Sequence, residues 1–87
     1  MTLTNGDIIR LKKEHEIRSS RSYPMLGLNE TMLKSIHTGG IYIVKNLRYY
    51  DDIDEYIFCI DRDCYTYAAD WVESKLTKAQ LVEDVMV

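Results

Sequence analysis

The sequence predicts a small, mainly β domain: a barrel of antiparallel strands with a short helix before the second strand and another helix at the C-terminus. Runs of β-branched, aromatic and aliphatic residues alternate with short polar runs that are typical of turns. The 87 residues suffice for one hydrophobic core. One proline and four glycines leave no room for a low-complexity linker. We therefore expect one domain, with the barrel over residues 1–75 and a helical extension over residues 76–87.

The expected strands are bounded by turn-forming residues. They are residues 8–12, 41–49, 56–60 and 64–68, with turns at 50–55 and 61–63. Alternation places Ile9 and Leu11 on one face of the first strand. On the second strand it places the apolar side chains of Ile41, Ile43, Leu47 and Tyr49 together. From residue 41 onward, the strands would form two successive antiparallel hairpins.

The connection between the first two strands combines a loop and a helix. Residues 14–28 show no hydrophobic period and gather serine, proline and glycine, so we expect a long loop. Asn29 is suited to cap the helix that follows, whose apolar face would consist of Met32, Leu33 and Ile36. Thr38-Gly39-Gly40 ends the helix where a left-handed residue is common. This helix would have about two turns, so its apolar face must dock on the sheet.

The C-terminal residues carry a helix signature of their own. Thr77 and Gln80 have the spacing of a capping box, and apolar residues follow over 81–86. The helix either packs on its own barrel or forms a surface for a partner or a second copy of the chain.

The two cysteines, Cys59 and Cys64, are expected to be free thiols. In the predicted hairpin Ile60 faces Cys64 and Cys59 faces Tyr65, so the two sulfur atoms are not directly opposed. Two cysteines with four intervening residues do not make a zinc site, which needs about four ligands. The only histidines lie in distant polar segments, at His15 and His37.

No pattern in the chain is typical of an enzyme. A glycine-rich phosphate loop and a strand–turn–helix nucleophile motif are both missing. The acidic side chains lie in predicted turns, where water keeps them ionised, and the run over 51–55 lacks the frame of a calcium loop. We therefore expect no catalytic residues, no cofactor and no metal ion.

The expected compartment is the cytoplasm. No apolar run reaches the roughly 18–20 residues that cross a bilayer. Residues 1–7 lack both the basic and the hydrophobic part of a secretion signal.

Charge is distributed unevenly along the chain. Residues 1–36 hold six basic and four acidic side chains, whereas residues 37–87 hold five basic and ten acidic ones. An acidic face of this kind attracts basic surfaces and repels nucleic acid. Tyrosines that border the acidic turns would add contact area for a protein partner. The predicted partner-binding residues are Tyr49, Tyr50, Asp51, Asp52, Asp54, Glu55, Asp61 and Asp63.

Residues 6–12 and the closing segment Ala69-Asp70-Trp71-Val72-Glu73 resemble the small SH3-like barrels, most closely those of phages and mobile elements. The likeness covers about residues 6–73. It implies that a one-turn 3₁₀ helix near Trp71 closes the barrel and that Trp71 fills its interior. The chain lacks the Ala-Leu-Tyr-Asp-Tyr-like strand and the closing proline of SH3 domains that bind proline-rich peptides, which argues against that activity.

We expect a non-enzymatic, phage-encoded binding module that engages a basic host protein, most simply a nucleic-acid-binding one, and inhibits or redirects it. One alternative is a nucleic-acid-binding barrel that uses Arg10, Lys12, Lys13, Arg18, Arg21 and Tyr23. A pI of about 5.2 argues against it. Another alternative is an assembly protein that forms a homodimer through its C-terminal helix.

Overall fold

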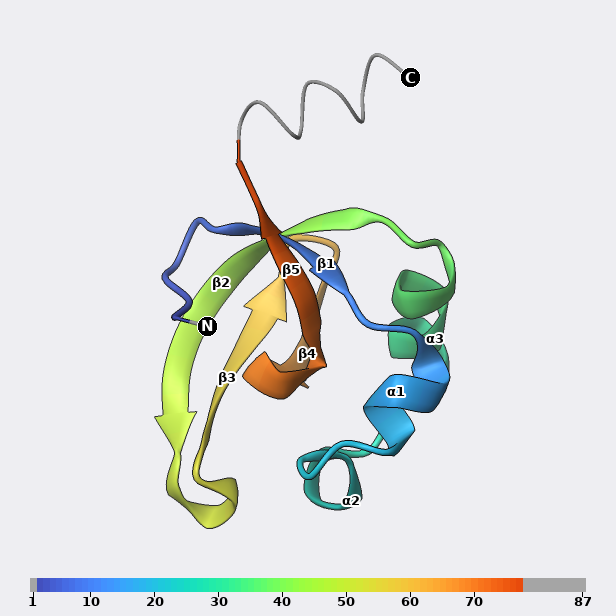
Figure 1. The fold of residues 1–87 in the computed structure, drawn as a ribbon, viewed down its shortest axis with the longest axis vertical. Coiled ribbons are helices and arrows are strands. Elements are labelled where there is room, and N and C mark those ends of the chain that lie inside the picture. Colours follow the sequence, from blue (N-terminus) through green and yellow to red (C-terminus); the bar gives the residue numbers. More distant parts are fainter. Residues whose placement is uncertain (1, 78–87) are drawn as a thin grey trace.

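The structure, a computed structural model, describes residues 2–77 and is built on a five-stranded antiparallel sheet (Figure 1). The strands are β1 (Ile8–Leu11), β2 (Ile41–Tyr50), β3 (Glu55–Ile60), β4 (Asp63–Ala68) and β5 (Val72–Leu76). Their order across the sheet is β4-β3-β2-β1-β5. The mainly β fold and its antiparallel hairpins are therefore confirmed. The sheet is not closed by strand pairing, because β4 and β5 form its two edges.

Strand β1 lies between β2 and the edge strand β5, and it carries the predicted alternation. Ile9 and Leu11 are buried, while Arg10 between them is only half-buried. Ile9 is opposite Tyr42 of β2 on one side and Lys75 of β5 on the other. The apolar face of β1 is thus part of the core, as predicted.

The buried face of β2 differs from the prediction. Tyr42 and Val44 are buried, whereas Ile43 is 40% exposed. The Tyr42 hydroxyl donates to the carbonyl oxygen of Ser35 at 2.8 Å, so the inward position satisfies its polar group. Asn46 adopts a left-handed conformation (φ 54°) within an irregularity of the β2–β3 pairing. This bulge lies after Val44 and shifts the inward positions of the strand, so that Leu47 also packs against the core. Apolar side chains alone could not reveal it.

The prediction of a loop over residues 14–28 is wrong. This segment contains helices α1 (Glu14–Arg18) and α2 (Tyr23–Leu26), and it is followed by the predicted helix α3 (Glu30–His37). All three lie on one side of the sheet in Figure 1. Helices α1 and α2 are too short to show a hydrophobic period, and one fully buried residue, Ile17, anchors α1.

Helix α3 begins and packs as predicted. The Asn29 side chain accepts a hydrogen bond from the Met32 backbone nitrogen at 2.9 Å, which caps the first turn. Met32 and Ile36 are buried in the core, and Gly39 follows the helix with φ 64°.

Trp71 fills the centre of the fold. It lies in the 3₁₀ helix η2 (Ala69–Trp71) between β4 and β5, and it is fully buried. Its indole nitrogen donates to the Ser20 hydroxyl at 2.8 Å, and its ring meets Tyr67 edge-on with centroids 6.1 Å apart. The prediction that Trp71 fills the interior is confirmed. The Ser20 contact also fixes the α1–α2 connection to the core.

The register of the β3–β4 hairpin differs from the prediction. Ile60 is opposite Asp63, and Phe58 is opposite Tyr67, with an irregularity between the two pairs. The expected partners Ile60 with Cys64 and Cys59 with Tyr65 are therefore wrong. The register shifts because β4 begins one residue earlier, at Asp63, whose carboxylate takes three hydrogen bonds inside the fold.

The predicted C-terminal helix falls almost entirely on residues 78–87, which lie outside the described residues. Leu76, assigned to that extension, is the last residue of β5 and is opposite Ile8. Within residues 2–77, no helix combines the length and the apolar character required to cross a membrane.

Candidate interaction site at the β2–β3 turn

We call the turn between β2 and β3, residues 51–54, the hairpin tip. It consists of the 3₁₀ helix η1 (Asp51–Ile53) and Asp54, which adopts a left-handed conformation (φ 52°) that aspartate tolerates. The Asp54 backbone nitrogen donates to the Asp51 carbonyl oxygen at 3.2 Å. Ile53 is buried and anchors the tip. The side chains of Asp51, Asp52 and Asp54 are exposed.

An aromatic pair stands beside the hairpin tip. Tyr49 of β2 is opposite Tyr56 of β3, and their rings meet edge-on with centroids 5.3 Å apart. Both remain about half exposed, at 48% and 51%. The Tyr49 hydroxyl donates a hydrogen bond to the Asp54 carboxylate. The pair that borders the acidic turn is therefore Tyr49 with Tyr56, rather than Tyr49 with Tyr50.

Tyr50 is half-buried and contacts the tip differently. A hydrogen bond with Asp52 raises the pKa of Tyr50, and the negative charge of Asp52 adds to the effect. Neighbouring residues on a strand point to opposite faces, so Tyr50 does not extend the surface of the Tyr49–Tyr56 pair.

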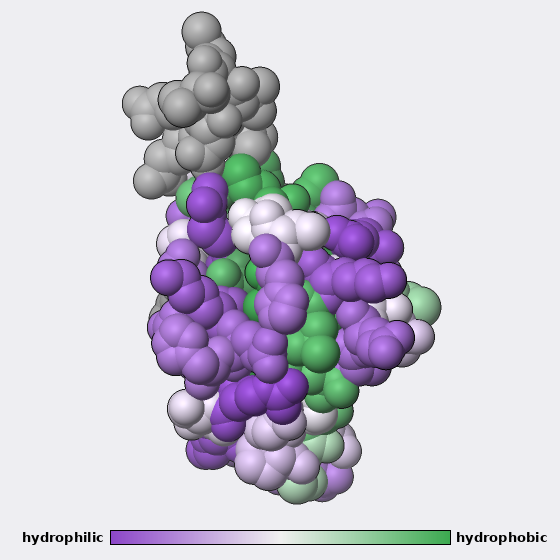
Figure 2. All heavy atoms as spheres, turned by 90° about the vertical axis from the view of Figure 1, so that its right-hand side faces the viewer, coloured by the Kyte–Doolittle hydropathy of each residue, from purple (hydrophilic) through white to green (hydrophobic). Residues whose placement is uncertain are grey.

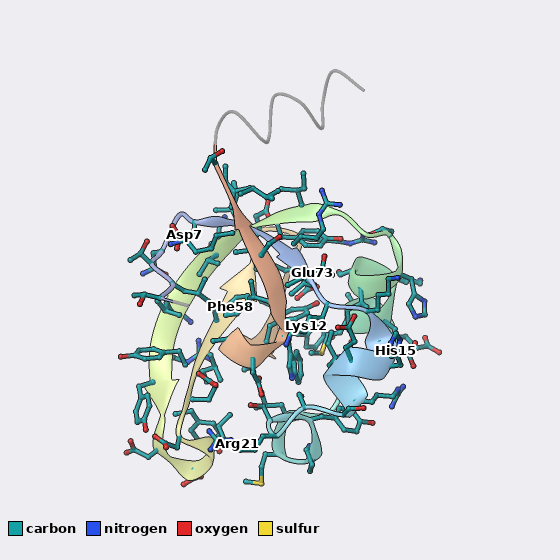
Figure 3. All side chains as sticks on the ribbon, viewed as in Figure 1. Asp7, Lys12, His15, Arg21, Phe58 and Glu73 are labelled. Carbon is teal, nitrogen blue, oxygen red and sulfur yellow. The ribbon has the colours of Figure 1, made fainter. Side chains whose placement is uncertain are left out.

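Arg21 connects the α1–α2 region to the hairpin tip. Its guanidinium donates to the carbonyl oxygens of Ile53 at 2.7 Å and of Asp54 at 2.8 Å. Figure 3 shows Arg21 between helix α2 and the tip. A cavity of about 280 Å³ lies here, lined by Arg21, Met25, Asp52, Ile53 and Asp54. Met25 is 58% exposed, so the cavity combines an apolar wall with two carboxylates.

The tip carboxylates are not used in the ion pairs of the described chain. Those pairs join Glu14 to Arg18 and His37, and Asp7 to Lys75. Arg21 contacts backbone carbonyls of the tip, and the hydroxyls of Tyr49 and Tyr50 hydrogen-bond to Asp54 and Asp52. Within residues 2–77 these two carboxylates therefore have neutral partners and can still accept from an external cation. Glu55, the remaining predicted acid of this turn, is half-buried and accepts from the Tyr56 backbone nitrogen at 3.0 Å.

The acids of the β3–β4 turn lie at the opposite end of β3 and have internal partners. Asp61 accepts from the Ile43 backbone nitrogen at 2.9 Å. Asp63 accepts from the hydroxyls of Ser35 at 3.2 Å and Tyr67 at 2.9 Å. The structure therefore divides the predicted binding residues into two groups that share no surface. Partner binding by Asp61 and Asp63 stays a prediction.

The basic residues proposed for nucleic-acid binding are partly engaged within the fold. Arg18 forms an ion pair with Glu14 at 2.7 Å, and its guanidinium lies 5.3 Å from the Tyr23 ring centre. Hydrogen bonds from Arg18 and then from His37 lower the pKa of Glu14. Arg18 and Tyr23 thus serve internal contacts, as does Arg21 through its hydrogen bonds to the hairpin tip. Arg10, Lys12 and Lys13 lie in β1 and the segment that follows it.

A second cavity, of about 350 Å³, opens between α1 and α3. Lys13, Glu14, Ile36, His37 and Gly39 line it. Figure 2 shows this side of the molecule, where a hydrophobic strip surfaces between hydrophilic side chains. Among residues 2–77, no three His, Cys, Asp or Glu side chains gather as a metal site would require.

Sequence reasoning missed three residues of the hairpin-tip site: Arg21, Met25 and Tyr56. Tyr56 could have been found, because pairing Tyr50 with Glu55 around a four-residue turn places it opposite Tyr49. Arg21 and Met25 come from the segment predicted as a loop, and only the packing of that segment brings them here.

Comparison with protein families, with curated proteins and with solved structures gave no match to this chain.

Proposed function

We propose that this chain is a non-enzymatic binding module with an SH3-like barrel, and that its hairpin tip binds a basic partner protein. Two observations support the barrel: the strand order β4-β3-β2-β1-β5, and the 3₁₀ helix η2 before the last strand. The buried Trp71 stands where the interior of such a barrel would need filling. Fold alone does not determine function, so the binding proposal depends on the hairpin tip.

The observation that carries the proposal is the half-exposed Tyr49–Tyr56 pair beside three exposed aspartates. Tyrosine supplies a large contact area with little conformational entropy to lose, and it is enriched where protein interfaces bind most strongly. Carboxylates that lack internal cationic partners match lysine and arginine side chains. Cations also bind favourably over aromatic rings. The tip therefore suits a surface rich in Lys or Arg.

The neighbouring cavity gives this interaction a specific contact. The methylene groups of a lysine or arginine from the partner would pack on Met25 and Ile53. The charged end would then reach the carboxylates of Asp52 or Asp54. The positive charge of Arg21 repels a partner's lysine or arginine in this cavity. Two carbonyl oxygens, however, hold the guanidinium of Arg21.

The partner class follows from charge. A nucleic-acid-binding protein presents a basic surface that binds phosphates, and a cluster of carboxylates can bind to the same surface. We propose that the chain is phage-encoded and that its target is such a host protein, which it inhibits or redirects. The net charge of −3 keeps the module itself away from nucleic acid.

Affinity capture from a host lysate, followed by mass spectrometry, tests the proposal. The wild-type chain should retain a basic protein at low salt and lose it at high salt, because exposed charges are screened. The variant Asp51→Lys/Asp52→Lys should not retain it. The control variant Glu16→Lys/Glu30→Lys makes the same charge change on the exposed side of α1 and α3 and should bind as the wild type does.

Equal capture by the wild type and the Asp51→Lys/Asp52→Lys variant would contradict the proposal. Thermal melting of each variant confirms that it is folded. Anisotropy titration of labelled single-stranded and duplex DNA at low salt addresses the nucleic-acid alternative. Micromolar binding that is lost in Lys12→Ala/Lys13→Ala, but kept in the tip variant, would favour that alternative.

A further inference from the structure

The observed β3–β4 register brings the two cysteines together. Ile60 is opposite Asp63 across the turn formed by Asp61 and Arg62. Cys59 and Cys64 are the next residues outward from the Ile60–Asp63 pair on their strands. The Cys59 sulfur donates to the Cys64 carbonyl oxygen at 3.5 Å. Both residues are free thiols in the structure.

The two cysteines also share the outer face of the hairpin. Ile60 is buried, and the Asp63 carboxylate binds the buried Tyr67, so this pair faces the interior. Side chains alternate along a strand, which places Cys59 and Cys64 on the other face. Cys59 is half-buried and Cys64 is exposed. A bond between them would not require the core to move.

Disulfide geometry is compatible with this position. Opposed residues of a regular antiparallel pair have Cα atoms about 4.5–5.5 Å apart. Disulfide-bonded cysteines span about 4.4–6.8 Å between the same atoms. Cys59 and Cys64 adjoin each other at an irregularity, where Cys59 faces residues 64–66, and the Cys59 sulfur lies 3.5 Å from the Cys64 carbonyl oxygen. The irregularity between Phe58 and Ile60 lies at Cys59, where it gives the strands local freedom to adjust.

We propose that Cys59 and Cys64 form a dithiol oxidation site, which a small disulfide of the glutathione type converts to an intramolecular disulfide. The exposed Cys64 reacts first: its thiolate attacks one sulfur of glutathione disulfide and releases one glutathione thiolate. The Cys59 thiolate then attacks the Cys64 sulfur of the mixed disulfide and releases the second glutathione. The chain loses two protons and two electrons, and glutathione disulfide is reduced to two glutathione molecules.

Oxidation would lock the β3–β4 turn. The bond closes a ring from residue 59 to residue 64 around Asp61, which holds the Ile43 backbone nitrogen. The conformational freedom of the turn in the unfolded chain falls, so the oxidised protein should melt at a higher temperature. The site lies at the opposite end of β3 from the hairpin tip, so its test is independent of partner binding.

The test equilibrates the full chain with mixtures of reduced and oxidised glutathione, traps free thiols by alkylation, and measures mass. The expected main product has lost two hydrogen atoms and takes no alkyl group, so both thiols disappear together. The single variants Cys59→Ser and Cys64→Ser should instead accumulate one bound glutathione. The oxidised wild type should melt above the reduced one, and Cys59→Ser should show no such oxidative shift.

A register control sharpens the result. In Cys64→Ser/Tyr65→Cys the thiol moves one residue along β4, to an exposed position away from the residue that the Cys59 sulfur contacts. This variant should accumulate mixed disulfides with glutathione. The proposal is overturned if the wild type also accumulates mixed disulfides or intermolecular dimers in place of the internal bond. It is equally overturned if the register control closes internally as readily as the wild type.

Discussion

The two turns that flank β3 are both rich in aspartate, yet they use it in opposite ways. At the hairpin tip Asp51 and Asp52 are exposed, and the basic side chain of Arg21 binds backbone carbonyls. At the β3–β4 turn Asp63 accepts hydrogen bonds from Ser35, Tyr67 and its own strand. The neighbours supplied by the fold therefore decide whether a carboxylate supports the structure or remains available to a partner.

The largest expected effect is on stability, from Asp63→Ala. The substitution leaves the hydroxyl of Tyr67 without its acceptor, and it removes one partner of Ser35; both residues are fully buried. Unsatisfied buried hydroxyls cost about 1–3 kcal/mol, so the free energy of unfolding should fall by about 2–3 kcal/mol. Urea titration followed by Trp71 fluorescence measures it. Asp63→Asn keeps an acceptor and should lose less; equal losses in both variants would contradict this role.

The next effect concerns alkaline pH at the same turn. Burial raises the pKa of Tyr67 well above its ordinary value. The hydrogen bond with Ser35 lowers the pKa, whereas the carboxylate of Asp63 raises it further. The folded state thus favours the neutral phenol. Its contribution is complete below the unfolded pKa of about 10 and is lost as pH rises beyond it.

The free energy of unfolding should therefore fall by at most about 1.4 kcal/mol for each pH unit above 10 through this group. Urea titrations from about pH 9 to about pH 11 measure the slope, and Tyr67→Phe should flatten it. Tyr50→Phe provides the matched control at the hairpin tip, where the tyrosine is less buried. An equal change of slope in both variants would contradict the distinction between the two turns.

A smaller effect is expected from Arg21→Ala. The variant loses two hydrogen bonds to the carbonyl oxygens of Ile53 and Asp54 at a partly exposed position. We expect the free energy of unfolding to fall by about 1 kcal/mol. Amide exchange at Asp54 should accelerate more than exchange at Phe58, because Arg21 fastens the tip rather than the sheet. Uniform acceleration across β3 would argue against that local role.

The smallest effect on stability is expected from Asp51→Asn. Substitutions of exposed side chains that lack internal partners usually change the free energy of unfolding by less than about 0.5 kcal/mol. Under the proposed function, capture of the basic partner should nevertheless weaken. This separation of stability from binding is the reverse of the result expected for Asp63→Ala. A loss of more than about 1 kcal/mol in Asp51→Asn would show that the tip carboxylate is structural.

The elements of the fold that depend on local signals could be predicted from the sequence. Asn29 caps α3 as its position indicated, and Ile9 and Leu11 face the core because β1 is a regular strand. The bulge at Asn46 could not be predicted, since its left-handed conformation depends on the pairing of β2 with β3. Helix α1 also escaped prediction, because the buried Ile17 alone anchors it.

The candidate site could be predicted only in part, for the same reason. Asp51 and Asp52 were identified from composition, and a turn rich in aspartate is normally exposed. Tyr50 was assigned to the surface although its hydroxyl is bound to Asp52. The role of Arg21 depends on a contact between residues more than thirty positions apart, and no local pattern encodes such a contact.

The position of β1 between β2 and β5 has a consequence for biosynthesis. The hairpins of β2, β3 and β4 join residues close in the chain, so they can form while translation continues. Strand β1 is made first, yet its second neighbour, β5, ends at Leu76. During synthesis, Ile9 therefore lacks its β5 neighbour, Lys75, until β5 has left the ribosome. The sheet is therefore completed only when β5 docks on β1.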